Sequence, residues 1–388
     1  MTQPAAATGL AVVRLTLNDF RCYPFLRLEV DPRPVVLTGQ NGAGKTNLLE
    51  ALSFLAPGRG LRRARLAEVA RRDAGEAAPW AVAARLARRE GPDGAVTTVD
   101  VGTGREAASE RRLVRIDGET VRSQAALSEI ASALWLTPAM DRLFSDGASG
   151  RRRFLDRLVL GIDPGHGTRA TAYEHALRER ARLLREGRFD PAWVALLESR
   201  MASAGTAMAV ARRDAVDRLN RACGQGLGPF PAARLSVEGA VETSLGDLAA
   251  DQAELSFRDA LAAARRRDRD AGITTVGPHR SDLVVRHASR DLPADQCSTG
   301  EQKAVLVAIV LGQARIQATL RGVPPILLLD EVTAHLDRER RAALFDELCA
   351  LGVQSWMTGT DQALFAELGD RGQFFCVQDA RLVPASGI

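Results

Sequence analysis

The stretch Gly39-Gln40-Asn41-Gly42-Ala43-Gly44-Lys45-Thr46 decides what kind of fold this sequence encodes. It fits the pattern G-x-x-x-x-G-K-[ST], follows the apolar run 35–37 and precedes a helical pattern over 47–52. A strand, a glycine-rich loop and a helix in this order predict a phosphate-binding loop, whose backbone N–H groups face an anion. Lys45 is then expected between the β- and γ-phosphates of ATP, and the Thr46 hydroxyl is expected to ligate Mg²⁺.

A second apolar run, Ile326-Leu327-Leu328-Leu329, ends in Asp330-Glu331. Four consecutive apolar residues are typical of a central parallel strand. At the carboxyl end of that strand, Asp330 is expected to reach Mg²⁺ and Glu331 to polarise the attacking water. The alternative is a buried strand that merely ends in two acids. Together with the phosphate-binding loop, the pattern favours an ATPase whose catalytic residues are Lys45, Asp330 and Glu331.

Composition excludes several classes of protein. The chain has 388 residues, a net charge of +4, 46% hydrophobic residues and 26% charged residues, which is ordinary for a globular protein of two or three domains. Its five cysteines contain no C-x-x-C pair, so neither a zinc site nor a disulfide framework is expected, and a cytoplasmic location fits. We find no run of about 18 apolar residues and no signal peptide, so no membrane association is expected. Lys45 and Lys303 are the only lysines, and both lie within motifs.

The residue composition and the hydrophobic periodicity change twice along the chain. Strand patterns dominate up to about residue 140, and residues 80–120 resemble short antiparallel strands. Ala, Arg, Leu and Glu at helical spacing dominate residues 141–270, and strand patterns return in 271–388. The simplest fold class is therefore α/β: a head built from 1–140 and 271–388, interrupted by a helical arm.

The segment Cys297-Ser298-Thr299-Gly300-Glu301-Gln302-Lys303 precedes an apolar helix and resembles the signature loop of ABC-type ATPases. On its own, such a segment is also a common helix start. Ala334-His335-Leu336-Asp337 resembles the D-loop of the same class. The resemblance implies an ABC-type head in which two subunits enclose ATP and hydrolysis releases them. The residues that it places against the partner's nucleotide are Ser298, Gly300, Glu301 and Asp337.

Four segments resemble the RecF family of bacterial recombination mediators. They are Leu17-Asn18-Asp19-Phe20-Arg21-Cys22-Tyr23, Gly39 to Leu52, Arg151-Arg152-Arg153-Phe154-Leu155-Asp156 and Gly277-Pro278-His279-Arg280-Ser281-Asp282-Leu283. The resemblance implies a protein that binds DNA with ATP, dimerises, hydrolyses ATP slowly and acts with RecO and RecR partners. It further implies recombinase loading at single-strand gaps next to duplex, and support of replication and the SOS response.

The sequence departs from these family patterns in several places. Ser281 stands where the RecF pattern has Asp, and Thr299 and Glu301 stand where ABC-type loops usually carry Gly and Gln. Thr358-Gly359-Thr360 follows the strand near 353–357 in place of a switch histidine, and no Q-loop glutamine is assigned. These departures favour slow turnover.

Basic clusters are candidates for contact with the DNA backbone. The candidate residues are Arg62, Arg63 and Arg65 within the run 59–72, and Arg151 and Arg152. A solvated helix surface is the alternative for the arm pair, and it is the simpler interpretation of 178–188 and 264–270, where acids alternate with arginines. His279-Arg280 either contacts nucleotide or DNA, or orders the start of a strand. With only two tyrosines, base stacking is not expected.

Three other functions fit parts of the sequence. A transporter or signalling cassette predicts a much shorter interval between Thr46 and the signature segment. An ATPase–nuclease of the OLD type needs a further acidic metal cluster, which residues 338–388 do not provide. A module that binds nucleotide without hydrolysing it would not depend on Glu331 for turnover.

Overall fold

The computed structural model describes residues 9–71, 73, 75, 78–89, 94–107, 109–187, 190–224 and 226–385. These residues form two compact units, each described by itself. The head comprises the described residues up to Asp141, the short segment Leu227–Phe230 and the described residues from Ser298 onward. The arm comprises Arg142–Gly226 and Pro231–Cys297. The α/β head with a helical arm is therefore confirmed as the fold class.

A largely parallel sheet forms the centre of the head, in the strand order β15-β14-β3-β13-β12-β8. Neighbouring strands from β14 to β8 run parallel, and β15 pairs antiparallel with β14 at the edge. The strands are β3 (Val35–Thr38), β8 (Ala133–Leu136), β12 (Ile326–Leu329), β13 (Ser355–Gly359), β14 (Gln373–Gln378) and β15 (Arg381–Pro384). All residues of β3, β12 and β13 are buried, as expected for parallel strands covered on both faces.

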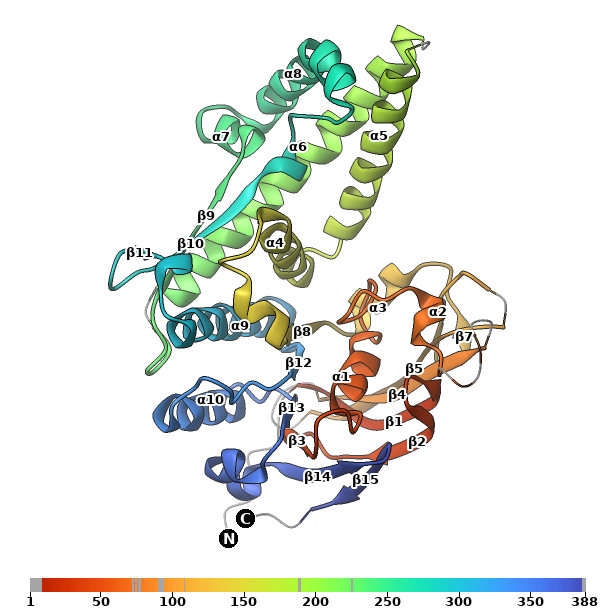
Figure 1. Ribbon diagram of the computed structural model, residues 1–388, viewed down its shortest axis with the longest axis vertical. Coiled ribbons are helices and arrows are strands. Elements are labelled where there is room, and N and C mark those ends of the chain that lie inside the picture. The colour runs from red at the N-terminus through yellow and green to blue at the C-terminus, as the bar shows by residue number, and fades with distance from the viewer. Residues whose placement is uncertain are drawn as a thin grey trace. The chain divides into compact units, whose positions relative to one another are not determined.

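Helices cover this sheet. In Figure 1, α9 and α10 lie on one side of it and α1 on the other. The helices of the head are α1 (Lys45–Ser53), α2 (Leu66–Val69), α3 (Leu127–Ile130), α9 (Thr299–Arg321) and α10 (Arg338–Ala350). By length and composition α9 could cross a membrane, but 72% of its most apolar window is buried inside the protein. Burial of this kind is typical of a core helix.

An antiparallel sheet forms the second layer of the head, in the order β2-β1-β4-β5-β6-β7. Its strands are β1 (Leu10–Phe20), β2 (Tyr23–Glu29), β4 (Trp80–Arg89), β5 (Val96–Arg105), β6 (Leu113–Ile116) and β7 (Glu119–Thr120). The antiparallel strands expected over 80–120 are therefore present. Phe20, Phe54 and Trp80 pack together, with ring centroids 5.2 to 6.1 Å apart. This cluster belongs to the core that both sheets share with α1.

The arm is helical, with one small sheet (Figure 1). Its helices are α4 (Ala148–Ile162), α5 (His166–Glu186), α6 (Pro191–Cys223), α7 (Ala240–Asp247) and α8 (Ala250–Ala271). The sheet has the order β11-β10-β9, formed by β9 (Ala233–Glu238), β10 (Asp282–His287) and β11 (Leu292–Pro293). Apolar residues of α5, α6 and α8, among them Tyr173, Met201 and Leu261, form its hydrophobic core.

The arm is longer than the segment 141–270 that the sequence indicates. Residues 271–297 lie in the arm and not in the head, because β10 pairs antiparallel with β9 along its whole length. The return of strand patterns after residue 271 therefore marks the arm's own sheet. The C-terminal part of the head begins at Ser298.

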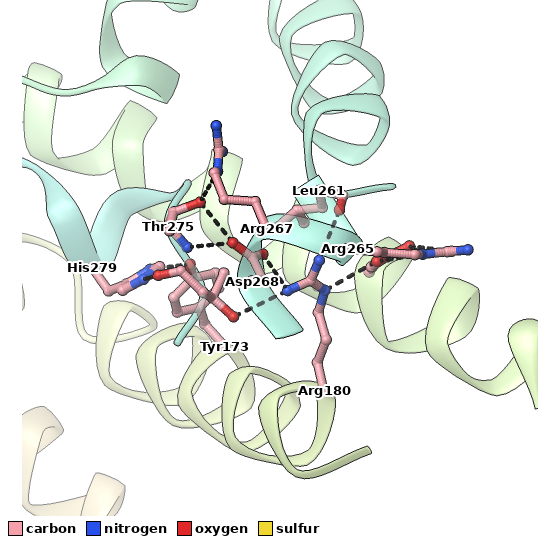
Figure 2. Close-up of polar contacts among 10 residues, drawn as sticks. Tyr173, Arg180, Leu261, Arg265, Arg267, Asp268, Thr275 and His279 are labelled. Atoms are coloured by element: carbon pink, nitrogen blue, oxygen red, sulfur yellow. Dashed lines mark hydrogen bonds and ion pairs between the residues drawn. The ribbon is translucent and has the colours of Figure 1, made fainter. Parts of the chain in front are cut away.

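A network of buried charges lies inside the arm (Figure 2). Arg180 is fully buried and donates hydrogen bonds to Glu198, Asp268, Thr274 and the carbonyl of Leu261. Each carboxylate of this network accepts at least one further hydrogen bond: Arg265 donates to Glu198, and the backbone and hydroxyl of Thr275 donate to Asp268. Since every charge is paired, the desolvation cost of burying them is offset.

Candidate nucleotide site

Gly39 and Gly44 give the phosphate-binding loop its shape. Gly39 leaves β3 with a φ of 140°, and a Cβ there would lie 2.3 Å from the carbonyl oxygen of Val377. Gly44 precedes α1 with a φ of 113°, and no side chain caps the helix. The N–H of Asn47 donates to the carbonyl of Gly44, so the N–H groups of Lys45 and Thr46 are the ones that can face an anion, and the helix dipole favours negative charge at this end.

Tyr23 supports this loop from the N-terminal segment that resembles the RecF pattern. Its hydroxyl donates to the carbonyl of Gly44 over 3.1 Å, and a Cβ on Gly44 would lie 2.7 Å from that hydroxyl. Next to it, Asn47 donates to the sulfur of Cys22. The N-terminal segment therefore fixes the start of α1, a role that its residue types do not reveal.

The Lys45 side chain lies along the loop. Its Nζ donates to the carbonyl oxygens of Gly39 at 2.6 Å and Gln40 at 2.9 Å. Burial lowers the pKa of Lys45, and the nearby carboxylates of Glu331 and Asp330 partly oppose this. The ammonium is thus held at the loop by two backbone acceptors, which a phosphate oxygen can replace.

Thr46 and Asp330 lie against each other, although 284 positions separate them in the sequence. The Thr46 hydroxyl donates to the Asp330 carboxylate, with Oγ1 2.9 Å from Oδ1. This distance equals the spacing of about 2.9 Å between neighbouring oxygens in octahedral Mg²⁺ coordination. The two groups are hard oxygen ligands, so they fit the ion expected here.

Thr358 completes this part of the site. It lies on β13, which pairs with β3 on one side and with β12 on the other. Its hydroxyl donates to Oδ1 of Asp330 at 2.7 Å and accepts from the backbone N–H of Glu331 at 2.8 Å. In the sequence, Thr358 is noted only because it stands where a switch histidine is expected. A polar residue near the carboxyl end of a central strand is the sequence feature that could have pointed to this role.

The backbone of Glu331 is held on both sides. Its φ of 48° is unusual for a residue with a side chain. Thr358 accepts from its N–H, and Nζ of Lys303 donates to its carbonyl over 3.2 Å. Lys303 is almost fully buried and also pairs with Asp141 at 3.5 Å. The two lysines of the chain therefore serve the same site from different helices.

The signature segment begins α9 with a capping box. Oγ of Ser298 accepts from the N–H of Glu301, and Oε2 of Glu301 accepts from the N–H and the hydroxyl of Ser298, both at 3.0 Å. Glu301 thus occupies donors that an incoming phosphate would use. A Cβ on Gly300 would lie 3.4 Å from the carbonyl of His335, and Asp337 caps α10 by accepting from the N–H of Arg340.

The candidate DNA residues of the head differ in their surroundings. Arg62 donates to Asn47 at 2.7 Å and to Glu50 at 3.0 Å, and Glu50 is also bound bidentately by Arg21. Arg62 is therefore attached to the helix that begins at Lys45. The backbone N–H of Arg65 donates to the Glu68 side chain, and Arg63 has a φ of 56°. Arg72, at the end of the run, lies outside the described residues.

The candidate DNA residues of the arm also differ. Arg151 forms a bidentate ion pair with Asp282, with N···O distances of 2.8 and 2.7 Å. Among the described residues, the hydrogen bond found for Arg152 goes to a backbone carbonyl, that of Ser281, at 2.8 Å. The buried Ser281 hydroxyl in turn donates to Glu242 at 2.6 Å. An Asp in place of Ser281 would set a second carboxylate against Glu242, and like charges at this distance repel each other.

A phosphate-binding loop, an acidic strand and a signature helix around one parallel sheet, with an antiparallel layer beside it, define an ABC-type ATPase head. A family model described as the RecF/RecN/SMC N terminal domain matches residues 11–377. The DNA replication and repair protein RecF of Allorhizobium ampelinum is 52% identical to this chain, over 95% of this chain and 97% of its own length. RecF of Mesorhizobium japonicum is also 52% identical, over 96% of this chain and 97% of its own length. The chain belongs to the RecF family.

Solved structures agree with the fold. A structure described as the recombination mediator protein RecF-ATPrS in the RecFOR pathway superposes with a TM-score of 0.83 at 19% identity. It covers 98% of this chain and 100% of its own. The Smc head domain from Pyrococcus furiosus, bound to the C-terminal domain of ScpA, gives a TM-score of 0.53 at 14% identity. The match covers 97% of this chain and 96% of the Smc chain.

Proposed function

We propose that this chain is an ATP-dependent DNA-binding protein of recombinational repair, working in the cytoplasm. Two copies associate when ATP binds, and the dimer binds duplex DNA next to single-strand gaps. Slow, DNA-dependent hydrolysis then separates the copies. With partners of the RecO and RecR type, the protein helps load recombinase, and so supports replication and the SOS response. The names of its relatives, DNA replication and repair protein RecF, support this role.

The observation that carries the proposal is the contact between Thr46 and Asp330 at the carboxyl edge of the parallel sheet. ATP binding lets the ammonium of Lys45 exchange the carbonyls of Gly39 and Gln40 for phosphate oxygens. Thr46 and Asp330 would hold Mg²⁺, which would neutralise negative charge on the phosphates. Glu331 accepts a proton from the attacking water, and its fixed backbone keeps its carboxylate in place.

The second copy supplies Ser298, Gly300, Glu301 and Asp337 to the nucleotide. The N-terminus of α9 attracts phosphate through its free N–H groups and its dipole. Glu301 opposes this attraction while it caps the helix, so its carboxylate has to turn away before phosphate binds. That extra step fits slow turnover. ATP drives association because it binds the dimer more tightly than the monomer.

DNA binding depends on arginines, since arginine matches phosphate oxygens and the chain offers little for base stacking. In the head the proposed contacts are Arg62, Arg63 and Arg65. Arg62 is 42% exposed while it pairs with Glu50. Glu50 keeps both hydrogen bonds to Arg21 if Arg62 turns to a phosphate, so the exchange leaves no unpaired buried charge.

Measurement of mass in solution tests the proposal. The wild-type chain is expected to be monomeric with ADP, dimeric with ATP, and bound to gapped DNA as a dimer with ATP. Lys45→Arg is expected to remain monomeric with ATP, because a guanidinium does not fit the place of the compact ammonium. A wild-type chain that stays monomeric with ATP, and whose DNA binding does not depend on salt, would refute the proposal.

A further inference from the structure

The segment Gly277-Pro278-His279-Arg280 in the arm presents two different kinds of side chain. His279 points into the arm: Nε2 donates to the carbonyl of Thr274 at 2.9 Å, so Nδ1 accepts from the Tyr173 hydroxyl at 2.7 Å (Figure 2). Burial lowers the pKa of His279, which keeps the ring neutral. Arg280 is exposed, and within the described part of the chain no hydrogen bond or ion pair of its side chain is found.

The backbone of this turn is held in one conformation. Gly277 has a φ of 135°, and a Cβ there would lie 2.3 Å from the hydroxyl of Tyr173. Arg212 donates to the carbonyl of Pro278 at 2.7 Å, and the Ser281 hydroxyl donates to Glu242. Since both ends of the turn are fixed, the Cα of Arg280 is presented at a defined place on the arm.

Arg152, on α4, lies near Arg280. Its guanidinium donates to the carbonyl of Ser281, the residue that follows Arg280. Its neighbour Arg151 is neutralised by the bidentate ion pair with Asp282, whereas the hydrogen bond found for Arg152 within the described residues goes to that neutral carbonyl. Burial lowers the pKa of Arg152 and the guanidiniums of Arg212 and Arg280 lower it further, while the nearby carboxylates of Asp282 and Asp156 partly oppose this. Arg152 and Arg280 therefore lie close enough to repel each other.

The carboxylates that bond to this part of the arm are already paired. Asp282 binds Arg151, Asp156 binds Arg212 and His166, and Glu242 accepts from Ser281 and Arg212. Within the described residues, none of these carboxylates is bonded to Arg152 or Arg280. An anion between these two guanidiniums would relieve their repulsion and gain charge-assisted hydrogen bonds.

We propose that Arg152 and Arg280 together bind a phosphate of the DNA backbone. The proposal rests on the DNA binding argued above, and it replaces Arg151 by Arg280 as the partner of Arg152. A phosphodiester suits the pair because its two free oxygens can each accept from one guanidinium. The contact reads no bases, so it adds affinity equally to every duplex sequence.

The salt dependence of duplex binding tests this pair in the full-length chain with ATP. Replacing both residues, by Arg152→Gln and Arg280→Gln, is expected to reduce the magnitude of the slope of log K against log salt by about 0.9, because the pair shares one phosphate and about 0.9 is lost per phosphate contact. Affinity is expected to fall by about 10-fold at 0.1 M salt. The loss is expected to be the same for unrelated duplex sequences.

A matched control separates this site from a general loss of positive charge. Arg178→Gln with Arg258→Gln also removes two exposed arginines from the arm, where they pair loosely with Glu174 and Asp259. This control is expected to keep the wild-type slope. Arg280→Gln alone guards against misfolding, since within the described residues this side chain makes no hydrogen bond or ion pair, and it is expected to reduce the slope by part of that amount.

Two results would overturn the inference in distinguishable ways. If wild type binds duplex with a clear salt slope and the Arg152→Gln, Arg280→Gln variant keeps that slope, the pair does not bind phosphate, while DNA binding by the protein stands. A pair that instead serves an acidic protein partner would give this same result. If wild type itself shows no salt-dependent binding, the proposed function fails and the site fails with it.

Discussion

The nucleotide site of the head and the charge network of the arm use similar groups in opposite ways. Arg180 in the arm is fully buried and makes four hydrogen bonds, to two carboxylates, a hydroxyl and a carbonyl. Lys45 in the head donates, among the described residues, to the carbonyls of two loop residues, beside a helix start that no side chain caps. A buried charge with all its partners stabilises the fold, whereas a charge on replaceable partners is free to bind a ligand.

Glu331→Gln tests the catalytic side of this comparison and is expected to have the largest effect. Removing a general base lowers the rate by about 10²- to 10⁴-fold. The amide keeps the size of the side chain, so ATP binding and the ATP-dependent dimer are expected to persist. Phosphate release and mass in solution measure both. Unchanged turnover would remove Glu331 from this role and favour a module that only binds nucleotide.

Arg180→Met tests the structural side. It leaves Asp268 buried without its guanidinium, and Glu198 with Arg265 alone, so the free energy of unfolding is expected to fall by about 3–5 kcal/mol. Denaturant unfolding and hydrogen exchange in α5 and α8 measure the loss. The control Arg182→Gln, on the half-exposed face of the same helix, is expected to change stability by less than about 0.5 kcal/mol. Equal stability of the two variants would show that the network does not stabilise the arm.

Lys303→Met tests a residue that shares features of both regions, since it is buried and also contacts the backbone of Glu331, the proposed general base. Its hydrogen bond to the carbonyl of Glu331 helps to hold a residue with a φ of 48°. We expect kcat to fall about tenfold with little change in KM, because a charge-assisted hydrogen bond contributes about 1.5–3 kcal/mol. Steady-state kinetics measure both constants, and Lys303→Arg is expected to restore part of kcat.

Asp141→Asn is the control for that variant, because Lys303 also pairs with Asp141 at 3.5 Å. It keeps the bond between Lys303 and Glu331 and is expected to retain most of the turnover. If Asp141→Asn loses as much turnover as Lys303→Met, turnover depends on the ion pair between Lys303 and Asp141 and not on the contact between Lys303 and Glu331.

The same contrast explains how much of this protein could be predicted from its sequence. The phosphate-binding loop and Asp330 stand in short local patterns, and the parallel sheet follows from the apolar runs 35–37 and 326–329. Thr358 follows no such pattern. Only the strand order, with β13 between β3 and β12, brings it to Asp330, and strand order depends on contacts between distant segments.

In the arm, too, contacts between distant segments could not be predicted from the sequence. The run Arg151-Arg152-Arg153 indicates positive charge, but it does not indicate which arginine is neutralised. Asp282, the partner of Arg151, lies 131 positions further along the chain. The boundary near residue 270 fails for a similar reason, because β10 belongs to the arm only through its pairing with β9.

The pH dependence of stability tests the smallest effect, the contribution of Asp156 to the arm. Burial alone would raise the pKa of this carboxyl, but hydrogen bonds from His166 and Arg212 outweigh burial and hold the pKa at about 2, below the ordinary 3.8. Because the folded state has the lower pKa, the contribution is fully present above about pH 4 and is lost as the pH falls toward 2. The difference in Tm between wild type and Asp156→Asn is therefore expected to be largest near neutral pH and to shrink below about pH 4. Asp259→Asn, at an exposed carboxylate, is the control and is expected to match wild type throughout. A Tm difference for Asp156→Asn that stays constant down to about pH 2.5 would show that the charge of Asp156 does not stabilise the arm.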